Sequence, residues 1–187
     1  MELHLIRHSP VKLSKKICYG RIDVPMAKSF KNDLKKIKSQ LDKKYDVVYT
    51  SPSQRCTLVA TGLGFNEFEI DEKLFELNFG DWEGIEWSKI NQIKLNYWMK
   101  NFVQKSPPRG ESFNKMYLRV KSFIEELRSK NFNKVLIISH SGVIRCFLKY
   151  FLNFPLNNAF RFPVGFNEHY IFNLSKNDKF DSIKKLK

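Results

Sequence analysis

Two histidines and two arginines follow apolar runs of the sequence at the points where those runs end. The run LHLI is followed by Arg7 and His8, and the run VLIIS is followed by His140. A third run, DVVYT, leads through a Ser-Pro pair to Arg55. Guanidinium groups bind phosphate oxygens through paired hydrogen bonds. A neutral imidazole can attack phosphorus while a second one stabilises the developing charge. These four side chains predict a site for phosphoryl chemistry, provided that the fold brings them together.

The three apolar runs must be neighbouring strands for their polar ends to meet. Each has the length of a strand. Apolar residues recur every three or four positions over 30–41 and over 113–127, which predicts amphipathic helices between the strands. In an α/β sheet, binding sites lie beyond the carboxyl ends of the parallel strands. We therefore predict an α/β fold, namely a three-layer α/β/α sandwich with a mostly parallel sheet.

Arg7 and His8 are adjacent in the sequence, which constrains the end of the first strand. In a regular strand, neighbouring side chains point to opposite faces of the sheet. Both can reach one pocket only if the chain leaves the strand at this point. The Ser-Pro pair that follows favours such an exit, because proline offers no ladder donor and disfavours a helical residue before it.

The composition is that of a globular protein with a basic surface. Of the 187 residues 42% are hydrophobic, and no repeat or flexible linker divides them, so we predict one domain over 1–187. The formal net charge is +14, with lysines spread along the predicted helices and the tail SIKKLK. A nucleic-acid-binding module, with LNYWMKNF as its aromatic and basic stretch, is the alternative of a different class. It would leave the histidines at the strand ends unexplained. We therefore expect no nucleic acid as a partner. We also expect no membrane, because no apolar run approaches the length of a membrane span.

No pattern of cysteines or histidines predicts a metal site. The three cysteines are widely spaced without a CxxC pair, which is typical of reduced structural thiols. His4 and His169 are interpreted as structural residues. The arginines and histidines of the predicted site already supply what a divalent ion supplies elsewhere, so we expect no metal and no other cofactor. The first strand begins without room for a signal peptide, and we expect a cytoplasmic protein that is a monomer or a homodimer.

Five motifs, in order along the chain, resemble those of the histidine phosphatase superfamily, which has the phosphoglycerate mutase-like fold. RHS is similar to its Arg-His-Gly motif, SPSQR to its SPxxR motif, and SHSGVIR to the motif around its second histidine. ELNFGDWEG, over 76–84, and GES, over 110–112, are similar to the other two. Ser9 and Ser141 stand where relatives commonly have glycine, which favours a phosphatase branch over a glycolytic mutase. The resemblance extends over nearly the whole chain.

The resemblance implies a role for each member of the predicted site. His8 would be the nucleophile that becomes a phosphohistidine. Glu76 would protonate the leaving alcohol and then activate water, and such a positioned acid contributes about 10²- to 10⁴-fold. His140 would be the third catalytic residue and stabilise the transition state. The phosphate group would be bound by Arg7, Arg55 and Ser141.

Three residues near these motifs have more than one interpretation. Glu111 and Ser112 could contact the substrate, but we interpret Ser112 as the cap of the following helix and Glu111 as a charge at its N-terminal dipole. Arg145 is interpreted as a member of a structural ion pair.

The segment after the first motif carries the information about the substrate. CYG, over 18–20, with Asp23 and Pro25, resembles the α-ribazole phosphatase branch, which implies hydrolysis of α-ribazole 5′-phosphate in cobalamin biosynthesis. Tyr19, Phe79 and Trp82 would then form an aromatic wall, and Tyr19 and Trp82 would contact the flat base of a small-molecule phosphomonoester. A phosphatase of broad specificity for sugar phosphates or nucleotides is the second interpretation, and a phosphoglycerate mutase is the third.

Overall fold

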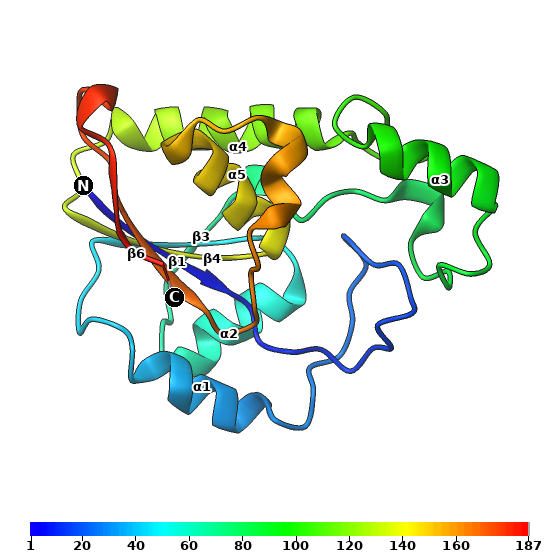
Figure 1. The fold of residues 1–187 in the computed structure, drawn as a ribbon. Helices are drawn as coiled ribbons and strands as arrows, with labels where there is room; N and C mark the ends of the chain where they lie inside the picture. The colour runs from blue at the N-terminus through cyan, green and yellow to red at the C-terminus, as the bar shows by residue number, and fades with distance from the viewer. Residues whose placement is uncertain (187) are drawn as a thin grey trace.

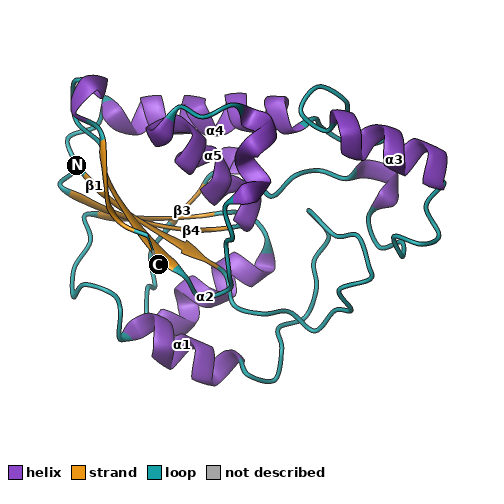
Figure 2. Cartoon of the chain, viewed as in Figure 1, coloured by secondary structure: helices purple, strands orange, loops and turns teal. Residues whose placement is uncertain are grey.

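A six-stranded β-sheet forms the middle layer of the fold, and helices cover both of its faces (Figures 1 and 2). The computed structural model describes residues 1–186, so the last residue of the domain predicted over 1–187 lies outside the described residues. The strand order is β3-β2-β4-β1-β5-β6. The strands are β1 (Glu2–Arg7), β2 (Val47–Thr50), β3 (Glu69–Ile70), β4 (Lys134–Ser139), β5 (His169–Asn173) and β6 (Ser182–Lys185). β5 alone runs against its neighbours within the described sheet. The predicted α/β class and the mostly parallel sheet are thereby confirmed.

Four helices form two layers, one on each face of the sheet, and a fifth helix projects away from the sheet. α1 (Phe30–Lys38) and α2 (Gln54–Leu63) cover one face, and α4 (Phe113–Arg128) and α5 (Ser141–Leu152) cover the other (Figure 1). α3 (Gln92–Asn101) projects beyond the edge of the sheet, at the right of Figure 1. The 3₁₀ turns are η1 (Glu72–Leu74), η2 (Gly80–Trp82), η3 (Leu156–Arg161) and η4 (Asp178–Phe180). Within the described residues, no helix has both the length and the apolar character required to cross a membrane.

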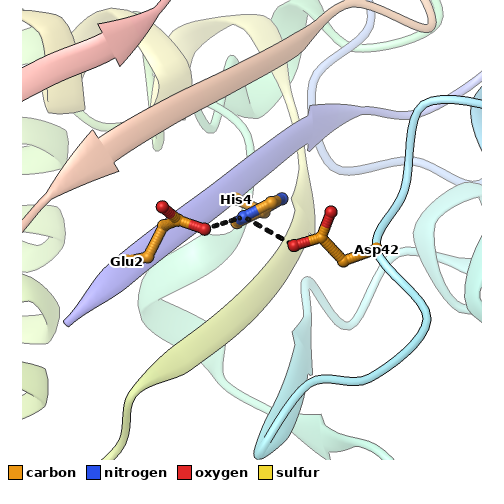
Figure 3. Close-up of side chains that lie close together, drawn as sticks. All are labelled: Glu2, His4 and Asp42. Atoms are coloured by element: carbon orange, nitrogen blue, oxygen red, sulfur yellow. Dashed lines mark hydrogen bonds and ion pairs between the residues drawn. The ribbon is translucent and has the colours of Figure 1, made fainter.

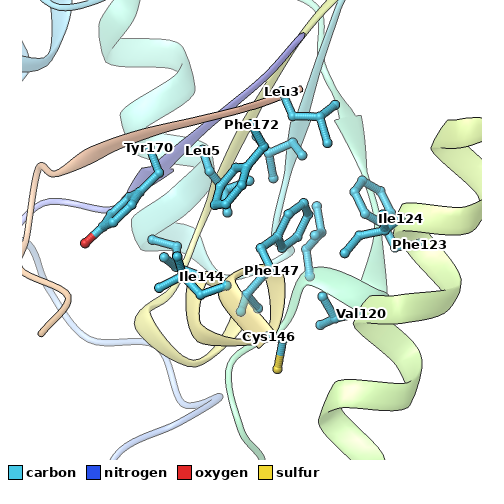
Figure 4. Packing of buried hydrophobic residues seen from close by; sticks show 14 of the residues in the cluster. Leu3, Leu5, Val120, Phe123, Ile124, Ile144, Cys146, Phe147, Tyr170 and Phe172 are labelled. Atoms are coloured by element: carbon cyan, nitrogen blue, oxygen red, sulfur yellow. The ribbon is translucent and has the colours of Figure 1, made fainter. Parts of the chain in front are cut away.

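The alternation of side chains along each strand divides the core between the two faces. Leu3 and Leu5 of β1 point toward α4 and α5, where they pack with Phe147 and Phe172 (Figure 4). Ile6 points to the opposite face and packs against α1 and α2. Because all of these side chains are fully or almost fully buried, the strands have little freedom to shift, and their carboxyl ends are held in a fixed register.

A polar cluster lies near the start of β1, at the end of the strand remote from Arg7. His4 Nε2 is 2.8 Å from Glu2 Oε1 and 3.9 Å from Asp42 Oδ2 (Figure 3). Lys134 pairs with both carboxylates, and Lys184 Nζ lies 2.6 Å from Glu2. The negative charge of the cluster is therefore balanced within the protein, which favours a structural role for these residues.

Candidate active site

The carboxyl ends of β1, β2 and β4 open onto a cavity of about 180 Å³. Most of the side chains predicted to form a site lie around it. Its walls are formed by Arg7, His8, Tyr19, Arg55, Glu76, Leu77, Phe79, Phe113, Ser141, Gly142 and Phe160. The ends of three strands that are far apart in the sequence thus contribute to one concave surface, as the strand-end argument predicted.

His8 is the first residue after β1 and is held in one tautomer. Its Nδ1 lies 2.8 Å from the carbonyl oxygen of Ser9. A carbonyl can only accept, so Nδ1 carries the proton and Nε2 retains its lone pair. Burial, with the charges of Arg55 and Arg7, holds the pKa of His8 well below 6.5. The imidazole is therefore neutral at physiological pH and equipped for nucleophilic attack.

His140 follows β4 and lies behind His8 as the N-cap residue of α5. The two imidazole rings have centroids 5.2 Å apart, and His140 Nε2 is 2.7 Å from Ser51 Oγ. Burial and the charge of Arg55 lower its pKa well below 6.5 as well. His140 does not itself line the cavity, and its ring meets the ring of His8 edge-on.

The two arginines are anchored by backbone carbonyls. Arg7 Nη1 donates to the carbonyl of Val164 (2.6 Å), and its guanidinium lies 3.7 Å from the centre of the Phe166 ring. Arg55 donates from Nη1 to Ile22 O (3.0 Å) and from Nη2 to Gly20 O (2.5 Å). The Nε atoms of both arginines are buried without a hydrogen-bond partner among the described residues. A guanidinium has five N–H donors, and both arginines line the cavity with fewer than five of these donors used, so each has donors left for an anion.

Glu76 reaches the cavity from the loop after η1 and touches the first turn of α5. Its Oε2 accepts from Ser141 Oγ (3.2 Å) and from Gly142 N (3.2 Å), and its Oε1 accepts from Leu77 N (3.0 Å). Ser141 lines the cavity as predicted for a phosphate-binding residue, but its hydroxyl donates to Glu76. Sequence reasoning missed Gly142, where an added Cβ would lie 2.2 Å from Glu76 Oε1. A glycine inside an apolar helical pattern was the available signal.

The aromatic wall differs from the predicted one. Tyr19 and Phe79 line the cavity, but Trp82 does not. Trp82 is buried in a small cluster under α3, where its ring meets Trp98 edge-on at 5.6 Å. The structure therefore places Trp82 outside the cavity wall, and its contact with the substrate stays a prediction. Phe160, which no sequence motif singled out, lies in the cavity wall.

The structure shows the contacts of the three residues that had more than one interpretation, Ser112, Glu111 and Arg145. Ser112 caps α4, since its Oγ accepts from Lys115 N at 3.2 Å. Glu111 does more than face a helix dipole, because it pairs with two arginines. Arg145 makes no ion pair with any carboxylate of residues 1–186. Its Nη1 donates to Ser141 O (3.2 Å), its guanidinium lies 4.9 Å from the centre of the Phe160 ring, and its buried Nε has no partner there.

Comparison with known proteins identifies relatives over nearly the whole chain. Residues 3–182 match the model of the histidine phosphatase superfamily, branch 1. The chain is 30% identical to putative phosphoserine phosphatase 2 of Hydrogenobacter thermophilus, over 83% of this chain and 81% of that protein. It is 25% identical to phosphoserine phosphatase 1 of the same organism, over 87% of this chain and 81% of that protein.

Solved structures share the fold at lower sequence identity. The α-ribazole phosphatase of Shigella flexneri superimposes with a TM-score of 0.88 at 24% identity, over 100% of this chain and 96% of that chain. A phosphoserine phosphatase of Entamoeba histolytica, solved with phosphoserine, gives 0.83 at 21% identity, over 99% of this chain and 95% of that chain. At such identities the likeness establishes a common architecture for the sheet and the helices around the cavity.

Proposed function

This chain belongs to branch 1 of the histidine phosphatase superfamily and is a phosphatase, and on that premise we propose that it hydrolyses phosphomonoesters through a phosphohistidine at His8. The observation that carries the proposal is the state of His8: it is buried and neutral, with Nε2 unprotonated and two guanidinium groups beside it. A neutral nucleophile among cations fits an anionic phosphate ester, because the cations stabilise the charge that builds up on phosphorus oxygens.

The reaction proceeds in two displacements at phosphorus. His8 Nε2 forms a bond to phosphorus while the bond to the ester oxygen breaks, and Glu76 transfers its proton to that oxygen to release the alcohol. Glu76, now a carboxylate, takes a proton from water, whose oxygen attacks phosphorus and displaces Nε2. Inorganic phosphate leaves, and His8 and Glu76 return to their first states. Arg7 and Arg55 hold the phosphate oxygens throughout.

We propose α-ribazole 5′-phosphate as the substrate. The segment over 18–20 supports this, and so do the aromatic side chains of Tyr19, Phe79 and Phe160 in the cavity wall. All phosphomonoesters present the same phosphate, so selectivity must come from contacts with the rest of the ligand. Stacking of a flat base on such a wall is worth about 1 to 3 kcal/mol, or roughly 5- to 160-fold in kcat/KM.

Phosphoserine is the second candidate, and Arg145 is the observation that favours it. The Arg145 guanidinium is half-buried, makes no ion pair within residues 1–186, and stands beside Phe160 and Ser141, which both line the cavity. A substrate that carries a carboxylate would supply the missing partner. The relatives named phosphoserine phosphatases, at 30% and 25% identity, agree with this candidate.

The test compares kcat/KM for α-ribazole 5′-phosphate, phosphoserine and ribose 5-phosphate, in the native protein and in Arg145→Met. Preference for α-ribazole phosphate over ribose 5-phosphate by about tenfold or more, unchanged in Arg145→Met, supports the first candidate. Preference for phosphoserine that Arg145→Met abolishes selects the second. Equal turnover of all three esters would contradict both and indicate a broad-specificity phosphatase. Absence of labelled phosphate on His8 after rapid acid-free quenching would refute the mechanism itself.

A further inference from the structure

Glu111 lies just before α4 with two guanidinium groups on its carboxylate. Oε1 accepts from Arg119 Nη2 at 2.7 Å and from Arg21 Nη2 at 3.1 Å, while Oε2 accepts from Arg119 Nε at 3.1 Å. Oε1 also accepts from the backbone N–H of Asn78 at 3.0 Å. Only 13% of the Glu111 side chain is exposed. We refer to Glu111, Arg119 and Arg21 as the Glu111 clamp.

Both arginines of the Glu111 clamp hold the backbone of the residue assigned as proton donor. Arg119 Nη2 donates to the carbonyl oxygen of Glu76 at 3.2 Å, and Arg21 Nε donates to the same oxygen at 3.4 Å. Arg119 Nη1 also donates to Lys73 O at 2.6 Å, on the N-terminal side of the loop. The peptide of Glu76 is thus fixed by two guanidinium groups, and one carboxylate fixes both of them.

The Glu111 clamp keeps its charge despite its burial. Burial by itself raises the pKa of Glu111, but the hydrogen bonds and charge of Arg119 outweigh it and lower the pKa below its ordinary value. The clamp also reaches the substrate side of the site, since Arg21 belongs to the segment that carries Tyr19. None of its three members lines the cavity. Glu76 is the cavity residue whose backbone carbonyl both arginines of the clamp contact.

We propose that the Glu111 clamp positions the Glu76 carboxyl for proton transfer to the leaving alcohol, which makes Glu111, Arg119 and Arg21 positioning residues. The proposal rests on the proposed role of Glu76. Proton transfer requires the donor to lie within hydrogen-bond reach of the ester oxygen, and a displacement of 1 Å can cost about a hundredfold in rate. Releasing the backbone of Glu76 should therefore slow the release of poor leaving groups.

The experiment uses Glu111→Gln with two esters, β-glycerophosphate as a poor leaving group and p-nitrophenyl phosphate as a good one. We expect kcat for β-glycerophosphate to fall about tenfold, as a partial displacement of Glu76 requires, with kcat for p-nitrophenyl phosphate and both KM values nearly unchanged. Glu126→Gln is the matched control, because Glu126 is a carboxylate on α4 that pairs with Lys73 at the surface. Equal slowing of both esters in Glu111→Gln would overturn the proposal.

The double variant Glu76→Gln/Glu111→Gln separates positioning from a general structural effect. If Glu111 acts through Glu76, the double variant should turn over β-glycerophosphate as fast as Glu76→Gln alone, because coupled residues are not additive. Additive losses would contradict the clamp. Arg21→Lys, whose side chain is one third exposed, gives the same test if Glu111→Gln does not fold. If Glu76→Gln itself slows both esters equally, the proposed proton donor is wrong, which is a different failure from that of the clamp.

Discussion

Replacing Gly142 with alanine would place a methyl group against the carboxyl of Glu76. Gly142 is in the first turn of α5, and a Cβ built there lies 2.2 Å from Glu76 Oε1 and 2.8 Å from the flexible end of Met116. The backbone conformation of Gly142 is not among the left-handed ones, so alanine meets no backbone strain. The substitution therefore acts on the neighbouring side chains, which are those of Glu76 and Met116.

The size of the effect follows from the distances. Ordinary van der Waals contact with a Cβ begins at 3.4 Å, so the Glu76 oxygen must withdraw by about 1.2 Å. A displacement of this size costs about 10²-fold in rate, or roughly 2.7 kcal/mol of transition-state stabilisation. The helix itself gains up to about 1 kcal/mol from alanine in place of glycine. We therefore expect a large loss of turnover with little change in stability.

The assay measures kcat for β-glycerophosphate and p-nitrophenyl phosphate, together with the thermal midpoint of unfolding. Gly142→Ala should slow the alkyl ester about a hundredfold, slow the activated ester far less, and shift the midpoint by no more than about 4 °C. Gly62→Ala is the control, because its Cβ would meet only the movable end of Leu34 on α1. Wild-type turnover of β-glycerophosphate by Gly142→Ala would refute the assigned position of the proton donor.

Three further predictions concern the histidines and the absence of a metal requirement. His8→Ala should lose nearly all turnover and the acid-labile, alkali-stable phosphate; normal activity would exclude His8 as the nucleophile. Exhaustive chelation should leave the rate intact, and a rate restored only by Mg²⁺ or Zn²⁺ would contradict this. Burial holds the pKa of His8 and His140 well below 6.5 and that of His169 at about 4. The unfolded chain thus binds more protons below pH 6.5, and the free energy of unfolding should fall from pH 6.5 toward 5, with a slope that approaches about 1.4 kcal/mol per pH unit for each histidine. Urea titrations at several pH values measure this slope, and a flat profile would contradict the burial of neutral imidazoles.

The positions of the site residues on strand ends were predictable, because the apolar periodicity that marks a strand also marks where it stops. Arg7 is the last residue of β1 and His8 follows it, and His140 follows β4. The helix predicted over 30–41 ends three residues earlier, at Lys38. Apolar spacing could not show this, because the last residues of the pattern pack without helical backbone.

The direction of the aromatic side chains was not predictable from local sequence. Phe79 and Trp82 belong to one loop, and only the first lines the cavity. The turn between them depends on Gly80, whose φ is +55° and whose Cα approaches the backbone of Pro108 and Gly110 so closely that a Cβ would lie 2.1 Å from Pro108 O. This contact joins segments almost thirty residues apart. No pattern within the loop predicts this contact. The position of Phe160 was also not predictable from local sequence, because tertiary packing brings it to the cavity.

The anchoring of Arg55 to the carbonyls of Gly20 and Ile22 bears on how the substrate range of this protein can be redesigned. The hydrogen bonds of the Arg55 guanidinium are to main-chain oxygens, so they do not depend on the identity of the side chains in the segment over 18–22. Gly20 and Arg21 must be retained, because a Cβ at Gly20 would lie 2.0 Å from Leu77 O and Arg21 belongs to the Glu111 clamp. A library that varies Tyr19, whose ring centre lies 5.6 Å from the Arg55 guanidinium, would therefore sample new ligand contacts while the main-chain hydrogen bonds of Arg55 remain.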